Sequence, residues 1–246
     1  MNNRNLSTLI FNKVYKRLNI EQCYICGFKG EGNLCSQCRT FLTPNTHHCG
    51  QCARPTLVSI DICGQCQSHP PAFKSVIAPL VYSGLTRALI TQAKFNNKGH
   101  LFRPLAKLLA HALLEQLDLS KPWHWCVVPT GRSSLLERGY CQTRFIRKLL
   151  KSHLKHTLEH PFHTFDISRS QERPTQHTLK KKERQRLSAK AFTVAKPAPD
   201  YVILIDDLIT TGSTIEACAK ALKQAGSKEV IVVALARTPS QTSEPL

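Results

Sequence analysis

The chain has 246 residues, of which 41% are hydrophobic and 20% are charged. This composition is typical of one sizeable globular domain with a small accessory module, and it excludes disordered and collagen-like chains. No apolar run reaches about 18 residues, and the basic residues within the first 18 positions interrupt any apolar core of a secretion signal. We therefore expect a cytoplasmic protein that is not an integral membrane protein. Its formal net charge of +18 favours polyanionic partners.

The N-terminal segment, residues 1–20, is predicted to form an amphipathic helix. Its apolar positions, among them Leu6, Ile10 and Val14, recur at helical spacing against a basic face. Such a stripe most often packs against its own protein, and the alternative is that it lies on a membrane surface.

Residues 21–70 are predicted to be a small module that lacks an apolar core, because they hold eight of the eleven cysteines and show little hydrophobic periodicity. The eight cysteines form four Cys-x-x-Cys pairs, and two such pairs complete a tetrahedral Zn²⁺ site. Four thiolates leave no open position for substrate, so we expect two structural Zn²⁺ ions in a double zinc ribbon. Disulfides or an iron–sulfur cluster are the weaker alternatives. Sequential combination of the pairs is favoured, with interleaving left open. The expected ligands are Cys23, Cys26, Cys35, Cys38, Cys49, Cys52, Cys63 and Cys66.

From residue 75 to about residue 240 the pattern becomes α/β. Helices are predicted over residues 85–95, 101–117, 140–154 and 214–225, and strands over residues 76–82, 125–128, 201–205 and 229–235. The last two strands are continuous apolar runs, which is typical of buried parallel strands. Strand 201–205, helix 214–225 and strand 229–235 together predict a βαβ unit in a mainly parallel sheet with flanking helices.

The polar segment 168–190 is predicted to be a basic surface flap with a helical part. Residues 131–196 contain 16 Lys and Arg against 5 Asp and Glu, more positive charge than one or two phosphate ligands require. A polynucleotide backbone does require it, and nearby aromatic residues would stack on unpaired bases. No base-reading motif is present, so binding of single-stranded DNA would tolerate any sequence. The alternative is a solvated helix face. The candidate nucleic-acid residues are Lys180, Lys181, Lys182, Arg184 and Arg186.

The most informative stretch is VILIDDLITTGSTIEACAKAL, residues 202–222. A buried strand delivers Asp206 and Asp207 to its C-terminal end, where carboxylates suit the vicinal hydroxyls of a ribose. The following turn stands at a helix N-terminus, whose backbone N–H groups and dipole suit a phosphate group. The turn consists of Thr210, Thr211, Gly212, Ser213 and Thr214. The stretch therefore predicts a cradle for ribose 5-phosphate, against the alternative of a capped helix after a strand.

This loop resembles the signature of type I phosphoribosyltransferases, which bind phosphoribosyl pyrophosphate (PRPP) with Mg²⁺. The resemblance implies catalytic or binding roles for Asp206 and Asp207. It also implies that residues 129–132 form the pyrophosphate loop, with Arg132 and Lys94 supplying positive charge to the leaving group. Each of these two cations has an alternative interpretation as a solvated surface residue.

The whole chain, from about residue 23 to residue 238, resembles the ComF family, whose members join an N-terminal double zinc ribbon to a phosphoribosyltransferase domain. Besides the cysteines and the phosphate loop, the resemblance includes LITQAKFNNKGHLFRPLAKLL, VVPTGRSSLLERGYCQT, RPTQHTLKKKERQRLSAKAF and the final LART. Cys141 and Ser188 stand where the family usually has asparagine. These departures alter ligand contacts if the asparagines touch a ligand, and otherwise concern packing alone.

Two functions of different class follow. The resemblance favours a competence-related protein that handles incoming single-stranded DNA, together with the DNA-uptake machinery, and that has a PRPP-type pocket. The alternative is an active phosphoribosyltransferase that transfers ribose 5-phosphate from PRPP to an acceptor. An intact loop does not by itself establish catalysis.

Overall fold

A computed structural model of the chain describes residues 22–29, 34–96, 98–131, 135–136, 138–158, 162–169, 191–195 and 197–239. The chain divides into two compact units, Met1–Leu42 and Thr43–Leu246. Each unit contains one group of four cysteines. The helix expected over residues 1–20 lies outside the described residues.

The described part of the first unit is a pair of turns around cysteines. Its only described helix is the short α2 (Ser36–Arg39), whose N-cap is Cys35. An antiparallel bridge between Gln22 and Lys29 closes the other turn, where the Cys23 N–H donates to the Phe28 carbonyl. With so little regular structure, this unit depends on what joins its cysteines.

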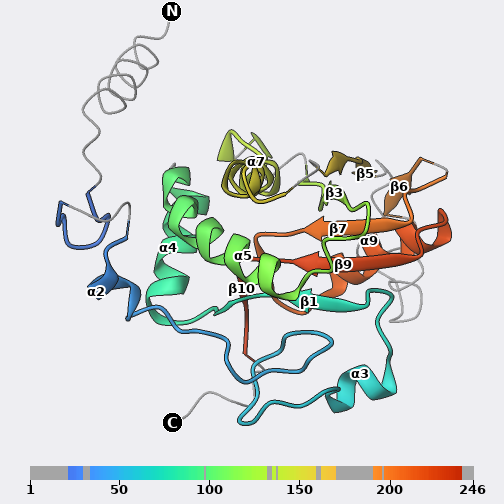
Figure 1. The fold of residues 1–246 in the computed structure, drawn as a ribbon, viewed down its shortest axis with the longest axis horizontal. Coiled ribbons are helices and arrows are strands. Elements are labelled where there is room, and N and C mark those ends of the chain that lie inside the picture. The colour runs from blue at the N-terminus through green and yellow to red at the C-terminus, as the bar shows by residue number, and fades with distance from the viewer. Residues whose placement is uncertain are drawn as a thin grey trace, which may run out of the picture. The chain divides into compact units, whose positions relative to one another are not determined.

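The second unit is built on a five-stranded sheet in the order β1-β9-β7-β3-β4, with every neighbouring pair parallel (Figure 1). Its strands are β1 (Ser75–Ile77), β9 (Glu229–Val233), β7 (Tyr201–Ile205), β3 (His124–Val127) and β4 (His163–Thr164). This arrangement confirms the predicted α/β class. The predicted βαβ unit is also present, because β7 and β9 are parallel neighbours joined through α9 (Ser213–Gln224).

Helices cover the sheet because their buried residues recur at helical spacing. The helices are α4 (Gly84–Phe95), the 3₁₀ turn η1 (Gly99–Leu101), α5 (Phe102–Gln116) and α7 (Gln142–Leu154) besides α9. The apolar face of α9 packs in one cluster with Val202, Leu204, Val230 and Val232. Because side chains alternate along a strand, Ile203 and the other intervening residues face the opposite side. Figure 1 shows α5 and α9 on opposite sides of the sheet.

The predicted strand over residues 76–82 is two strands in two sheets, which corrects that prediction. β1 ends at Ile77, and β2 (Leu80–Val81) joins a small parallel sheet in the order β2-β10-β8. The break falls at Pro79, which has no N–H to donate to a ladder. The partners of β2 are β10 (Ala236–Arg237) and β8 (Leu208–Ile209). In this second sheet β8, which follows β7, pairs with β10, which follows β9.

The basic flap emerges from a two-stranded antiparallel sheet. Its strands, β5 (Ile167–Arg169) and β6 (Phe192–Val194), pair so that Arg169 lies opposite Phe192. Residues 170–190, which include all five candidate nucleic-acid residues of the flap, lie outside the described residues. The short helix α3 (Gly64–Ser68) also belongs to the described part of the second unit.

Candidate functional site

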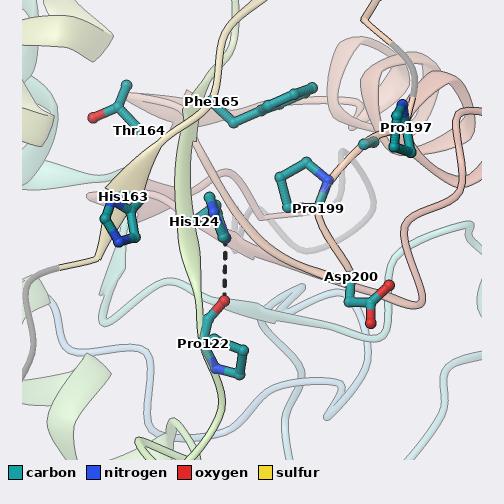
Figure 2. A pocket seen from close by; sticks show the side chains of 9 residues that line it. Pro122, His124, His163, Thr164, Phe165, Pro197, Pro199 and Asp200 are labelled. Atoms are coloured by element: carbon teal, nitrogen blue, oxygen red, sulfur yellow. Dashed lines mark hydrogen bonds between the residues drawn. The ribbon is translucent and has the colours of Figure 1, made fainter.

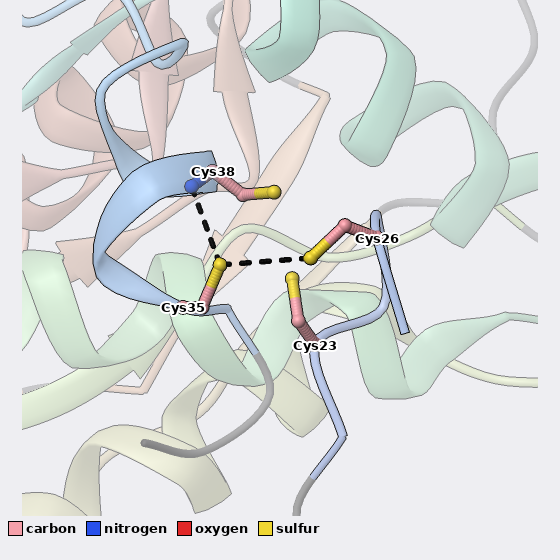
Figure 3. Close-up of side chains that lie close together, drawn as sticks. All are labelled: Cys23, Cys26, Cys35 and Cys38. Carbon is pink, nitrogen blue, oxygen red and sulfur yellow. Dashed lines mark hydrogen bonds between the residues drawn. The ribbon is translucent and has the colours of Figure 1, made fainter. Parts of the chain in front are cut away.

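Two groups of four sulfurs are each gathered within 4.8 Å. The Cys26 and Cys35 sulfurs lie 3.7 Å apart, and the Cys52 and Cys63 sulfurs lie 3.8 Å apart. A tetrahedral Zn²⁺ with Zn–S bonds of about 2.3 Å places its sulfurs about 3.8 Å apart, so both groups fit that ion. Figure 3 shows the four side chains of the first group pointing toward one another. The first cluster is Cys23, Cys26, Cys35 and Cys38, and the second cluster is Cys49, Cys52, Cys63 and Cys66. The pairs are therefore combined sequentially.

The electrostatics of the clusters favour a bound cation. Burial and the neighbouring thiols raise the pKa of Cys38 to about 12. In the second cluster, burial and the charges on Cys52 and Cys63 raise the pKa of Cys66. Four thiolates at this spacing repel one another, and a divalent cation removes that repulsion by displacing the protons. Metal binding should therefore release protons and weaken as the pH falls.

The turn between β8 and α9 presents hydrogen-bond donors to solvent. Helix α9 begins at Ser213 after Gly212, whose φ of +85° lies in the left-handed region that favours glycine. Thr211 Oγ1 lies 3.0 Å from Ser213 Oγ and accepts a hydrogen bond from the Ser213 N–H at 3.4 Å. The side chains of Thr210 and Thr214 are also exposed. Since the first N–H groups of a helix have no intrahelical acceptor, this end of α9 suits an anion.

An acidic pair stands directly beyond the C-terminal end of β7. Lys94, in the last turn of α4, lies with its Nζ 2.8 Å from Asp207 Oδ1, and both side chains are almost buried. The Asp207 N–H donates to Asp206 Oδ1 at 2.9 Å. Burial and the charge on Asp207 raise the pKa of Asp206 to about 8. At neutral pH Asp206 therefore favours its protonated form, and the Lys94 ammonium lies directly against the acidic pair.

Behind the turn, the fully enclosed Arg237 on β10 contacts three backbone carbonyls. Its Nε donates to Cys52 O at 3.2 Å, and its Nη1 donates to Ile209 O at 3.0 Å and also to Thr210 O. The neighbouring Thr238 Oγ1 donates to Thr210 O at 3.2 Å. These contacts were not predicted from the sequence, because the final LART carries no spacing that points to the phosphate loop.

The candidate pyrophosphate loop follows β3 and is described as far as Gly131; Arg132 lies outside the described residues. Thr130 Oγ1 lies 3.2 Å from the sulfur of Cys141, the N-cap residue of α7. A Cβ built on Gly131 would lie 3.1 Å from Arg169 Nη1. Arg169, at the base of the flap, is therefore a cation beside this loop that the sequence analysis missed. The sequence offered one weak signal for Arg169, its position two residues after the apolar Ile167 in an otherwise polar segment.

Comparisons with known proteins agree with this geometry. The phosphoribosyl transferase domain profile matches residues 149–246. The chain is 29% identical to a DNA utilization protein (YhgH) of Escherichia coli K12 over 226 residues, which cover 88% of this chain and 96% of that protein. It is 29% identical to competence protein F of Haemophilus influenzae over 84% of this chain and 91% of that protein. These similarities extend over most of the chain and agree with the expected resemblance to the ComF family. Competence protein ComFC of Streptococcus pneumoniae is a further relative, 26% identical over 83% of this chain and 87% of that protein.

A solved structure shows a more distant similarity. A hypoxanthine-guanine phosphoribosyltransferase from Bacillus anthracis covers 59% of this chain and 73% of its own, with 14% identity and a TM-score of 0.38. That likeness is weak. Among the described residues, no helix is both long and apolar enough to cross a membrane.

A separate open hollow lies at the other edge of the sheet, where the strands begin. Figure 2 shows His124 and His163, the first residues of β3 and β4, with Phe165 and the segment before β7. The two imidazole rings lie 5.7 Å apart between centroids. Because the phosphate-binding turn follows the opposite end of β7, this hollow is not part of that site. It is lined by Pro122, His124, His163, Thr164, Phe165, Pro197, Ala198, Pro199 and Asp200.

Proposed function

We propose that this protein binds a phosphoribosyl ligand of the PRPP type at the C-terminal edge of its parallel sheet. One observation carries the proposal: the acidic pair after β7 and the anion-binding start of α9 stand on consecutive parts of one strand–turn–helix unit, and Lys94 of α4 reaches the same place, with its Nζ 2.8 Å from Asp207 Oδ1. Ligands of open α/β sheets bind at this edge. A capped helix alone would need neither a nearly buried Lys94 nor a pair of acids.

The residues divide between the two ends of such a ligand. The 5-phosphate would be held by backbone N–H groups and hydroxyls of Thr210, Thr211, Gly212, Ser213 and Thr214. Asp206 and Asp207 would accept hydrogen bonds from the ribose hydroxyls. Carboxylates and ligand phosphates are also the usual donors to Mg²⁺, which would neutralise charge on the pyrophosphate. Lys94, Arg132 and Arg169 would supply further positive charge at that end.

The test is calorimetric titration of the zinc-loaded chain with PRPP and Mg²⁺. Asp206→Asn/Asp207→Asn preserves the shape of both side chains and removes their negative charge, so the affinity should fall at least about 100-fold. The matched control is Asp200→Asn, which also removes a carboxylate next to β7 but at the opposite edge of the sheet. Equal affinities of the double variant and the control in folded proteins would refute the pocket.

Catalysis is the further question at the same pocket. Active transfer would release pyrophosphate from PRPP when an acceptor base or nucleoside attacks the anomeric carbon of the ribose. Cys141, which contacts Thr130 in the candidate pyrophosphate loop, replaces an asparagine that the family resemblance leads us to expect. Pyrophosphate release with a panel of nucleobases distinguishes a transferase from a protein that only binds the ligand.

We also propose that the protein handles single-stranded DNA, in keeping with its similarity to a DNA utilization protein and to competence proteins. Arg103, Lys107 and His111 are exposed and four residues apart on α5, so they form one stripe with steps of about 6 Å. Helix α7 packs against α5, and burial together with Lys107, His111 and Arg103 lowers the pKa of its His153. Among the described residues, no carboxylate forms an ion pair with the three members of the stripe. Unbalanced positive charge of this kind suits a polynucleotide backbone.

The flap and the stripe can be tested separately. Arg103→Gln/Lys107→Gln/His111→Gln should weaken single-stranded DNA binding and flatten its salt dependence by roughly 0.7 per lost phosphate contact. Lys180, Lys181, Lys182, Arg184 and Arg186, changed together to Gln, should act in the same way if the flap contributes. Lys220→Gln/Lys223→Gln/Lys228→Gln is the control, because it removes three cations on and after α9. DNA affinity that falls as much in the control as in the other variants would mean that only overall charge matters.

A further inference from the structure

Arg237 is the buried charged group that the proposed pocket does not use. It is 3% exposed, and among the described residues it forms no ion pair with a carboxylate. Its side chain instead spans from Cys52, a ligand of the second cluster, to Ile209 and Thr210, which enter the phosphate-binding turn. A buried guanidinium requires both hydrogen-bond acceptors and a compensating negative charge.

The second cluster supplies that negative charge when it holds a metal. Four thiolates and one divalent cation have a net charge of −2, and Arg237 touches the backbone of one of the four ligands. One group of buried side chains contains all four cysteines of the second cluster together with Ile209 and Ile215. A Cβ built on Gly212 would contact both of these isoleucines. A further hydrogen bond joins the segment after the second cluster to α9: the Ala72 N–H donates to Glu216 in the first turn of that helix at 3.0 Å.

The contacts of Arg237 determine how the turn presents its donors. In a planar trans peptide the carbonyl and the following N–H point in opposite directions. When Arg237 and Thr238 hold the Thr210 carbonyl on the inner side, the Thr211 N–H points away from them, toward the exposed side of the turn. The orientation of this donor therefore depends on a guanidinium that is anchored to Cys52.

We propose that the second cluster supports the phosphate-binding turn and that Arg237 is the positioning residue that couples metal occupancy there to binding of a phosphate-bearing ligand. The ligand half of this inference rests on the proposed function; the structural half does not. The first cluster, in a separate compact unit, provides the comparison. By thermodynamic reciprocity, a ligand that binds better to the metal-loaded form must also retain the metal more tightly.

The structural half is tested without ligand, by amide hydrogen exchange of the full zinc-loaded chain. Arg237→Gln should accelerate exchange over residues 210–215 by about tenfold, within the range of ordinary coupling energies, while zinc content stays at two per chain. Arg237→Lys, which keeps the charge but loses the fork, should give an intermediate rate. Arg87→Gln, an exposed arginine of α4, is the control for charge. Unchanged exchange in this turn, or equal acceleration throughout the second unit, would overturn the inference.

The ligand half uses zinc release to a chelator in Cys38→Ser, a variant that retains only the second site. PRPP with Mg²⁺ should slow release by about tenfold, and the added change Arg237→Gln should abolish that protection. Release that is equally slow with and without bound PRPP would overturn the coupling. If the wild-type chain binds no PRPP, the proposed function fails, while the exchange experiment still decides the role of Arg237. If Arg237→Gln does not fold, exchange at residues 210–215 in the wild-type chain before and after removal of zinc decides the matter, with no change overturning the inference.

Discussion

The two tetracysteine clusters have similar ligand spacing and different surroundings. The first is closed by local contacts: Cys35 accepts a hydrogen bond from the Cys38 N–H, and the Gly27 N–H donates to the Cys23 carbonyl. The second shares a buried cluster with Val202, Leu204 and the inner face of α9. An identical ligand set can thus be the main support of a small unit, or part of the core of a larger one.

The largest difference should appear when single ligands are removed. Cys66→Ser should lower the main thermal transition by about 10 °C or more, because it exposes an incomplete cluster within the core of the second unit. Cys38→Ser should leave that transition within about 2 °C, because the first cluster lies in the other unit. Differential scanning calorimetry of zinc-replete proteins measures both. Equal shifts in the two variants would contradict the comparison.

The sequence predicted the elements of this structure better than it predicted their neighbours. The limits of β7 were predicted without error, because a continuous apolar run followed by two aspartates has one plain interpretation. The sequential pairing of the cysteines was also favoured, and both clusters have it. The break at Pro79 was missed, although a proline inside a strand is a visible signal. The break reflects strand pairing, because β1 pairs with β9 whereas β2 pairs with β10.

The missed site residues share a physical cause. Arg169 and Arg237 reach the candidate site from segments distant in the chain, and only tertiary structure brings them there. Lys94 was proposed from family resemblance, and the structure adds its contact with Asp207 across 113 positions. Residue type and local spacing indicate what a segment offers, and they do not indicate which segment it meets.

A smaller effect should come from the hydrogen bonds around the second cluster. Asn45 is buried, and its Nδ2 donates to the carbonyls of Ala53, next to Cys52, and of Ala78, after β1, at 2.9 and 3.1 Å. Asn45→Ala leaves both carbonyls without this donor and should cost about 2 kcal/mol of unfolding free energy. Thr40 follows α2 in the first unit, and its hydroxyl donates an exposed hydrogen bond to the Gln37 carbonyl. Thr40→Ala should therefore lower the unfolding free energy of the same transition by less than about 0.5 kcal/mol. Urea titrations at constant zinc concentration compare them, and a smaller loss for Asn45→Ala would count against the integration of the second cluster.

The last effect has the opposite sign and concerns the acids of the pocket. Burial and the charge on Asp207 raise the pKa of Asp206 to about 8, above its ordinary value near 4. The folded chain therefore holds a proton that the unfolded chain releases. Its contribution to stability is fully present below about pH 4 and is lost as the pH rises through about 8. Asp206 lies in the second unit, so this dependence belongs to the second unit.

Asp206→Asn removes the ionisation and should make the second unit more stable than the wild type at pH 8.5. The advantage should shrink steadily toward pH 5, where the wild-type carboxyl is protonated in the folded state. Urea unfolding at several pH values, in phosphate-free buffer with saturating zinc, measures it, and Asp200→Asn controls for loss of a carboxylate at the opposite edge of the sheet. A constant difference across this range would mean that Asp206 is ionised throughout. A gain confined to high pH would show that the second unit tolerates an unfavourable acid pair where it is proposed to bind ribose.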